Sequence, residues 1–452
     1  MKELLLDAAL RADRYLTEIA TRRVSPAPNA IAALSRFDVP LQNDPIDPNA
    51  VLKELDEVGS PGTMGIAGPR FYGFVIGGSL PAALAANWLA GAWDQNSGLY
   101  NVTPVSAVLE EVSLKWMLDV LGLPRECAGA FVTGTTVAHI TALAAARHAV
   151  LAKAGWNVEA DGLFGAPPIT VVVSAEAHPT LHKALGVIGL GRNRVIKGPT
   201  DAQGRMRADA LPPIHGPAIV CAQVGNVNSG ACDPMPALVA YARKHGAWLH
   251  VDGAFGLWAR VAPTRAHLVE GVEGADSWAT DCHKWLNVPY DSGLAFVRDG
   301  DALRAAMAVS AEYLPTVTER RNPSDHTPEL SRRARGIDVW AALRSLGRAG
   351  LAELVERNCR QARRFAQCLS AAGHTVHNDV VLNQVVVSFG TPQETRRVIA
   401  EIQADGTCWC GETAWQGQTA MRISVISWAT TDEDVERSLN AILRIASVRS
   451  AL

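Results

Sequence analysis

The chain lacks the long uncharged hydrophobic run that a membrane helix requires. No apolar segment approaches the roughly 20 residues needed to cross a bilayer. The apolar patch near the N-terminus is interrupted by Asp7, Arg11 and Asp13. That interruption predicts an amphipathic helix and argues against a signal peptide. We therefore expect a cytoplasmic protein with no membrane partner.

The chain also lacks a basic surplus and a disulfide pattern. Its formal net charge is −3 over 452 residues, so it has no basic footprint for nucleic acid. Its eight cysteines are scattered apart from Cys408 and Cys410. That pair has no second ligand pair nearby, so we expect no metal site. The motifs of P-loop proteins, α/β-hydrolases, zincins and dinucleotide-binding proteins are missing as well. A small molecule remains the expected ligand.

Between residues 130 and 300, short apolar runs alternate with helical patterns. The expected strands are residues 130–133, 169–174, 194–197, 218–224, 248–251, 277–280 and 293–298. Helical stretches at 137–154, 180–190 and 235–245 lie between them, the last ending before Gly246. Near-continuous apolar strands that alternate with helices predict an α/β domain with a mostly parallel seven-stranded sheet.

The length of the chain suggests more than one domain. Residues 1–80 hold helical and proline-rich stretches, which we expect to pack on a neighbouring surface. Residues 81–334 form the expected α/β domain. Residues 335–452 combine a long helical pattern with two strand-like segments, which predicts a small C-terminal α+β domain.

Polar residues follow four of the expected strands. A turn containing Thr135 and Thr136 begins a helix, and His178, Asp252 and Lys284 follow three other strands. Each has an ordinary structural interpretation: a helix cap, a core histidine or a surface lysine. In parallel sheets, however, ligands bind beyond the carboxyl ends of the strands. The coincidence of all four at such ends favours one shared site.

The four groups match the needs of pyridoxal 5′-phosphate (PLP). A lysine forms the Schiff base, and a carboxylate pairs with the pyridine nitrogen so that the ring accepts electrons. An imidazole stacks on the ring, and a threonine-rich helix N-terminus binds the phosphate. The pattern therefore predicts a PLP enzyme.

The segments HVDGAFG and DSWATDCHKWLNVPYDSGLAFVRD resemble the core signature of the group II PLP-dependent amino-acid decarboxylases. PRFYGFVIGGSLPAALAANWLAGAWDQN, SAEAHPTLHKAL, QVGNVNSGACDP, SRRARGIDVWAALRSLG and AMRISV extend the resemblance over roughly residues 65–430. The family includes aromatic amino-acid, histidine and glutamate decarboxylases. The resemblance implies PLP fold type I and a homodimer with a shared active site.

The resemblance also implies roles for individual residues. Lys284 matches the Schiff-base lysine, Asp252 the pyridine partner and His178 the stacking imidazole. The remaining implied cofactor contacts are Thr135, Thr136, Asn226, Ala254, Asp281 and His283. Asp281 stands where the family more often has asparagine, and a carboxylate beside phosphate needs a compensating donor. Arg422 matches the arginine that meets the substrate carboxylate, while Phe71 and Trp93 are expected at the entrance.

The implied reaction is α-decarboxylation of an L-amino acid to the amine and CO₂. Many relatives protonate Cα with a loop tyrosine, but residues 314–329 contain none, so His326 is the candidate acid. This departure leaves open a C–C lyase or aldolase, or an aldehyde-forming decarboxylase. A more distant alternative is a catalytically silent, PLP-free interaction protein. The identity of the amino acid is not readable from the sequence.

Overall fold

A computed structural model of the chain describes residues 1–309 and 320–448. The chain divides into two compact units. The larger unit comprises Ser79–Arg360 and Asn378–Gln384, and the smaller comprises Met1–Gly78, Gln361–His377 and Val385–Leu452. The expected three-part division differs from this one, because the N-terminal segment groups with the C-terminal part of the chain.

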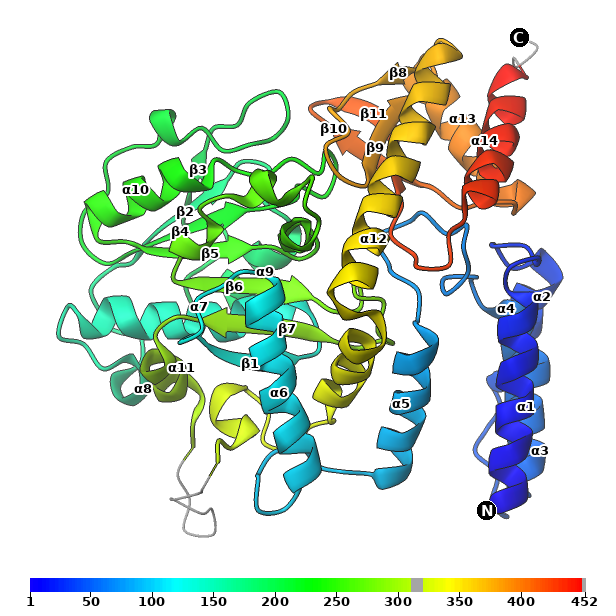
Figure 1. Cartoon of the computed structure of the whole chain (residues 1–452), viewed down its shortest axis with the longest axis horizontal. Coiled ribbons are helices and arrows are strands. Elements are labelled where there is room, and N and C mark those ends of the chain that lie inside the picture. The colour runs from blue at the N-terminus through cyan, green and yellow to red at the C-terminus, as the bar shows by residue number, and fades with distance from the viewer. Residues whose placement is uncertain (310–319, 449–452) are drawn as a thin grey trace. The chain divides into compact units, whose positions relative to one another are not determined.

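The larger unit is built on a seven-stranded sheet in the order β1-β7-β6-β5-β4-β2-β3 (Figure 1). Its strands are β1 (Ala128–Val132), β2 (Thr170–Ser174), β3 (Val195–Gly198), β4 (Ala218–Gln223), β5 (Trp248–Asp252), β6 (Ser277–Asp281) and β7 (Gly293–Val297). Strands β2 to β6 pair in parallel, while β7 runs antiparallel to both β6 and β1. The predicted mostly parallel sheet is thus confirmed.

Helices of the larger unit lie before, between and after these strands in the sequence. They are α5 (Pro81–Trp93), α6 (Pro104–Val120), α7 (Thr135–Ala152), α8 (Val158–Asp161), α9 (Pro179–Val187), α10 (Met235–His245), α11 (Gly300–Met307) and α12 (Arg335–Ala371), which contributes to both units. Short 3-10 helices are η3 (Ala208–Ala210), η4 (Gly256–Val261), η5 (Ala266–Val269), η6 (Val272–Gly274) and η7 (Pro323–His326). Helix α10 ends at Gly246, whose positive φ of 63° provides the left-handed cap.

Helix α7 packs against the sheet through alanine. The residues that form this face are Ala138, Ala142, Ala145, Ala146 and Ala149, which share a buried cluster with Val171, Val173 and Ile219 of the strands. Because alanine has a short side chain, the helix backbone approaches the sheet closely. This packing fixes the N-terminus of α7 at the carboxyl edge of the strands.

The smaller unit contains a four-stranded sheet in the order β10-β11-β9-β8. Its elements are α1 (Lys2–Glu18), α2 (Pro28–Ala33), η1 (Leu34–Phe37), α3 (Pro48–Glu54), the π-helix η2 (Leu55–Gly59), α4 (Ser60–Gly62), β8 (Thr375–Val376), β9 (Gln384–Ser388), α13 (Pro392–Asp405), β10 (Gly411–Trp415), β11 (Gln418–Ser424) and α14 (Asp432–Ser447). Helix α1 buries no residue within the chain. Among the described residues, no helix has the length and apolarity needed to cross a bilayer.

A buried ionic cluster holds the segment before α12 against β1. The Arg332 guanidinium donates to Glu110 across 2.6 Å and to the carbonyls of Ser97 and Phe131, and both charged side chains are almost completely buried. Arg321 lies 3.6 Å from the same carboxylate and donates to the carbonyl of Gly129. The two arginines thus share one acid that water does not reach.

We predict that Arg332→Met lowers the free energy of unfolding by about 3–5 kcal/mol, because it leaves the Glu110 carboxylate buried with less compensation. Arg320→Met is the matched control, since Arg320 is 47% exposed and pairs with Glu111 at 3.4 Å. Its cost should stay below about 1 kcal/mol. Urea denaturation of both variants checks this, and equal losses would contradict it.

Candidate active site

Lys284 and Asp281 meet beyond the end of β6. The Lys284 ammonium lies 2.9 Å from Asp281 Oδ2, while Oδ1 accepts a 2.7 Å hydrogen bond from the N–H of Thr135 at the start of α7. Burial by itself would raise the pKa of Asp281, but Lys284, His283 and a hydrogen bond from Thr135 together bring it below its ordinary value. Asp281 therefore carries a charge in the neutral range, and Lys284 and the Thr135 N–H are the donors that compensate it.

Asp252 is the last residue of β5 and is 4% exposed. Its Oδ1 accepts a 3.1 Å hydrogen bond from the N–H of Ala254, and Oδ2 lies 3.5 Å from Nε2 of His139. Burial opposes ionisation, yet His139, His178 and Lys284 hold the pKa of Asp252 well below its usual range. The sheet edge thus presents a permanently charged carboxylate with almost no water around it.

His178 is half-buried at the N-cap of α9. Its Nδ1 accepts from the backbone N–H of Thr180 at 3.4 Å and lies 2.8 Å from the Thr180 hydroxyl. With Nδ1 accepting, the ring proton of the neutral form sits on Nε2. This capping contact fixes the imidazole in a position from which it lowers the pKa of Asp252.

The N-terminus of α7 fits a phosphate group. Thr135 Oγ1 is buried and has no hydrogen-bond partner among the described residues, so a donor stands ready for a ligand. Gly293 lies so close to Gly134 that an added Cβ would meet its Cα at 2.3 Å, which keeps this turn tight against β7. Thr136 follows in the first turn, half-buried. These features fit PLP, whose phosphate needs N–H groups and hydroxyls.

His283, Ala254 and Asn226 surround the same edge of the sheet. His283 Nε2 lies 3.5 Å from Asp281 Oδ1, its Nδ1 accepts from Ser292 N–H, and its ring stacks on Tyr290. The Ala254 carbonyl accepts from the N–H of Asp281, so the loops after β5 and β6 are tied together. Asn226 Oδ1 accepts from the N–H groups of Asn228 and Ser229, so that side chain shapes its own turn.

The three residues expected to bind the substrate are divided between the two units: Phe71 and Arg422 belong to the smaller unit and Trp93 to the larger one. Phe71 is 4% exposed and stacks on Trp409 at 5.0 Å within the smaller unit. Arg422 lies on β11 of that unit, and burial lowers the pKa of its guanidinium to about 10, which leaves it charged at neutral pH. Trp93 ends α5 in the larger unit and is 44% exposed.

His326 is not brought to this group within the chain. It lies in η7 and is 8% exposed, and its Nδ1 lies 3.3 Å from the Asn322 carbonyl oxygen. Burial, with the charge of Arg321, lowers the pKa of His326 to about 3. The ring is therefore neutral near pH 7 and holds no imidazolium proton. Residues 314–319 of the expected loop lie outside the described residues.

Sequence analysis missed two buried groups beside Asp252. His139 lies one helical turn after Thr135, so the i,i+4 spacing would have placed both on the same face of α7. Gln223, the last residue of β4, pairs in register with Asp252 and is 6% exposed. His139 lies outside every segment quoted for the family, whereas Gln223 begins the quoted segment QVGNVNSGACDP but was given no role there.

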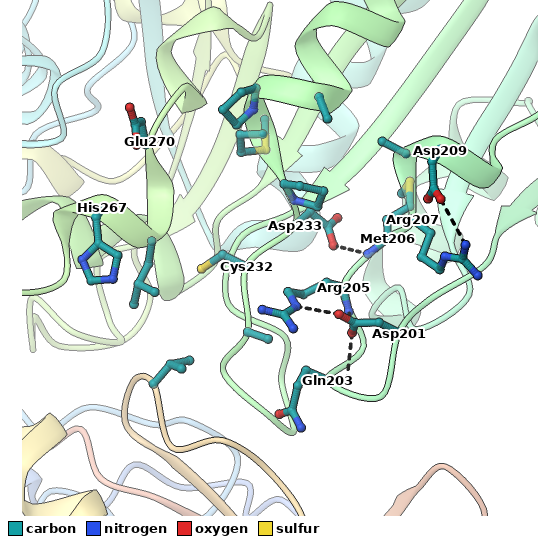
Figure 2. A pocket seen from close by; sticks show the side chains of 18 of the residues that line it. Asp201, Gln203, Arg205, Met206, Arg207, Asp209, Cys232, Asp233, His267 and Glu270 are labelled. Carbon is teal, nitrogen blue, oxygen red and sulfur yellow. Dashed lines mark hydrogen bonds and ion pairs between the residues drawn. The ribbon is translucent and has the colours of Figure 1, made fainter.

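A separate cavity of about 580 Å³ in the larger unit has a different character (Figure 2). Its arginines are paired with its acids: Arg205 with Asp201 at 2.7 Å and Arg207 with Asp209 at 3.1 Å. Asp233 accepts from the N–H groups of Met206 and Gln223. Lys284, Asp252 and His178 are absent from the described residues that line it. The candidate site is therefore identified by the chemistry of its side chains and not by the volume of this cavity.

We predict that Asp281→Asn strengthens phosphate binding to the apoprotein, because it removes an anion that occupies the Thr135 N–H. Pyridoxine 5′-phosphate, which has no aldehyde to react with Lys284, should bind about tenfold more tightly. Asp281 stays ionised from pH 6 to 8, since its pKa lies below that range. The gain should therefore grow with pH as the phosphate monoester loses its second proton at about pH 6.

Asp291→Asn is the control for this experiment, because Asp291 is a nearby carboxylate that is 42% exposed and pairs with Arg335. Fluorescence titration gives the dissociation constants. Unchanged or weaker binding by Asp281→Asn would show that its carboxylate does not compete with phosphate.

Comparison with known proteins now adds to this geometry. The family model described as the pyridoxal-dependent decarboxylase conserved domain matches residues 28–389. The chain is similar to tryptophan decarboxylase 1 of Oryza sativa subsp. japonica, with 30% identity over 73% of this chain and 68% of that protein. It is also similar to 4-hydroxyphenylacetaldehyde synthase of Rhodiola rosea, with 27% identity over 79% and 75%.

Solved structures show the same fold. The crystal structure of Oryza sativa TDC with PLP and tryptamine matches with a TM-score of 0.91 at 23% identity, covering 99% of this chain and 97% of that one. The family model spans well over half of the sequence, and the buried groups around Lys284 fit its cofactor. The chain belongs to the pyridoxal-dependent decarboxylase family.

Proposed function

We propose that this chain removes the α-carboxyl group of an L-amino acid as CO₂ and releases the amine, with PLP attached to Lys284. The observation that carries this proposal is the buried, ionised Asp252 beside Lys284 and His178. A carboxylate held charged in the protein interior supports an electron-accepting pyridine ring. When bound, PLP takes up the electron pair left by the bond that breaks at Cα.

Each residue around the proposed ring position has its own proposed role. Asp252 would keep a proton on the ring nitrogen, and His178, fixed through its Nδ1, would contact the ring. Lys284 provides the covalent attachment, with its ammonium beforehand held at Asp281 Oδ2. The Thr135 and Thr136 hydroxyls, with His283, bind the phosphate. Ala254 leaves room for the ring.

Arg422 is the proposed partner of the substrate carboxylate, because its guanidinium stays charged at neutral pH. A substrate with an acidic side chain finds less support. The five arginines between residues 320 and 335 all have acidic partners: Arg320 with Glu111, Arg321 and Arg332 with Glu110, Arg333 with Asp338 and Arg335 with Asp291. We therefore propose an apolar or aromatic amino acid as the substrate, with Phe71 and Trp93 near its entrance.

The proposal includes a homodimer with a shared active site. Helix α1 buries no residue, and its Leu5, Leu6 and Leu10 are more than half exposed. Helix α5 likewise exposes Trp88 and Leu89. Apolar surface of this extent is typical of subunit contacts, and we propose that residues 1–80 pack on the partner. All eight cysteines are free, which fits a cytoplasmic setting.

An aldehyde-forming decarboxylase is the second candidate. The similarity to an aldehyde synthase favours it, as does the absence of tyrosine from residues 314–329. The two reactions differ in their products: amine and CO₂ in one, and aldehyde, ammonia, CO₂ and hydrogen peroxide in the other, with O₂ consumed. Product analysis therefore separates them.

We predict that the PLP-loaded protein releases CO₂ and amine in equal amounts from at least one aromatic L-amino acid. Lys284→Ala should lose this activity by several orders of magnitude, whereas Lys183→Ala, which removes an exposed lysine of α9, should keep it. Borohydride reduction followed by peptide mapping should place the cofactor on Lys284.

Each measurement has an outcome that contradicts the proposal. Aldehyde and peroxide in place of amine would favour the second candidate. Cofactor recovered on another lysine would remove Lys284 from its role. Absence of CO₂ release from every amino acid in the panel would overturn the reaction itself.

The role expected for His326 is not part of the proposal, because the ring is buried and neutral. We predict that His326→Gln leaves the ratio of amine to CO₂ unchanged and lowers stability by about 1–2 kcal/mol. Simultaneous assay of amine, aldehyde and CO₂ checks this. A shift of product towards aldehyde would restore His326 as the proton donor.

A further inference from the structure

A row of buried polar groups runs from the interior of the larger unit to Asp252. Trp248 Nε1 lies 2.8 Å from Ser277 Oγ, which lies 2.9 Å from His250 Nδ1. His250 Nε2 lies 2.9 Å from His139 Nδ1, and His139 Nε2 lies 3.5 Å from Asp252 Oδ2. Every member is at most 6% exposed. Helix α7 and strands β5 and β6 each contribute to the row.

The direction of the hydrogen bonds follows from the indole end. An indole N–H only donates, so Ser277 Oγ accepts from Trp248 and its own hydrogen is available for His250 Nδ1. His250 then carries its proton on Nε2 and donates to His139 Nδ1. His139 in turn carries its proton on Nε2, which faces Asp252. One assignment therefore satisfies every group with both imidazoles neutral and the carboxylate charged.

The reverse direction is unfavourable. If His250 Nδ1 donated to Ser277, His139 Nδ1 would have to donate to His250. A neutral His139 would then turn the lone pair of Nε2 towards the Asp252 carboxylate. Burial lowers the pKa of His250, so a charged His250 does not rescue this arrangement. With His139 neutral, only the first polarity suits the carboxylate. A second proton on His139 would also place an N–H on Nε2, so the donor end of the row faces Asp252 in either protonation state.

His139 Nε2 has no other hydrogen-bond partner among the described residues. Its 3.5 Å separation from Oδ2 is longer than an ordinary hydrogen bond, and such contacts often shorten once a site is filled. Asp252 Oδ1 is already oriented by the Ala254 N–H. A donor on Oδ2 would fix the second oxygen and complete the orientation of the carboxylate.

We infer that His139 is a positioning residue for the cofactor: as the donor end of the Trp248–Ser277–His250–His139 row, it orients the Asp252 carboxylate towards the ring nitrogen. The inference rests on the role proposed for Asp252. It assigns to His139 a contribution that passes entirely through that nitrogen. A core histidine that only fills space would stabilise the fold without regard to the chemistry of the ring.

The experiment compares PLP with its carba-analogue, in which a C–H group replaces the ring nitrogen. Wild-type apoprotein should bind PLP more tightly than the analogue, and the ratio of the two dissociation constants measures the contact with the nitrogen. His139→Met, which is similar in volume but has no donor, should reduce this ratio about tenfold. His139→Gln, whose amide N–H reaches the position of Nε2, should retain most of it.

Thr141→Val is the matched control on the same helix. Thr141 is fully buried, and its hydroxyl donates to the Val137 carbonyl within α7, away from Asp252. This variant should leave the ratio unchanged. Equal weakening of both ligands by His139→Met, with an unchanged ratio, would overturn the inference and leave His139 as a packing residue.

Two further variants keep the test decisive. If His139→Met does not fold, Ser277→Ala removes the hydroxyl that fixes the polarity of the row, and the ratio should fall about threefold; no change would count against the row. Asp252→Asn tests the underlying role separately. A ratio unaffected by Asp252→Asn would refute the role of Asp252, whereas a ratio sensitive to Asp252 and insensitive to His139 would refute only this inference.

Discussion

The site depends on one costly arrangement, a charged carboxylate at the end of a fully buried strand. A buried Asp normally loses its charge, because desolvation favours the neutral acid. Asp252 keeps its charge through His139, His178 and Lys284, which reach it from three different connections of the sheet. The fold must therefore bring these segments to one edge before the carboxylate is useful.

Two carboxylates share the positive charge at this edge, and their surroundings separate their roles. Asp281 ion-pairs with Lys284 and caps the first N–H of α7, so it belongs to the phosphate end. Asp252 accepts from the Ala254 N–H, lies beside His139 and belongs to the ring end. Attachment of Lys284 to a cofactor removes the cation next to Asp281 but leaves the hydrogen bonds of Asp252. Asp252 then loses the Coulombic support of Lys284 and depends on His139 and His178 for its charge.

The sequence was most informative where burial is uniform. All seven strands of the large sheet were predicted within two residues of their observed bounds, because most are near-continuous apolar runs. Strand β3 is the exception to uniform burial, since Ile196 and Lys197 are exposed. Strand β10 was missed, since its side chains alternate between exposed and half-buried positions. The grouping of residues 1–78 with the C-terminal part depends on distant contacts such as Tyr72 N–H to the Trp409 carbonyl. No local pattern encodes such contacts, and the same holds for His139 against Asp252.

The antiparallel course of β7 has a consequence for chain entropy. Because β7 returns beside β6, residues 282–292 leave and re-enter the sheet at the same edge, and the N–H groups of Cys282 and His283 donate to the Ser292 carbonyl. A crossover helix would instead have carried the chain away after Lys284. The short closed loop restricts the lysine in the unliganded chain, so much of the ordering entropy is lost during folding and little remains to be lost on binding. Ligand capture then draws on a segment that folding has already ordered.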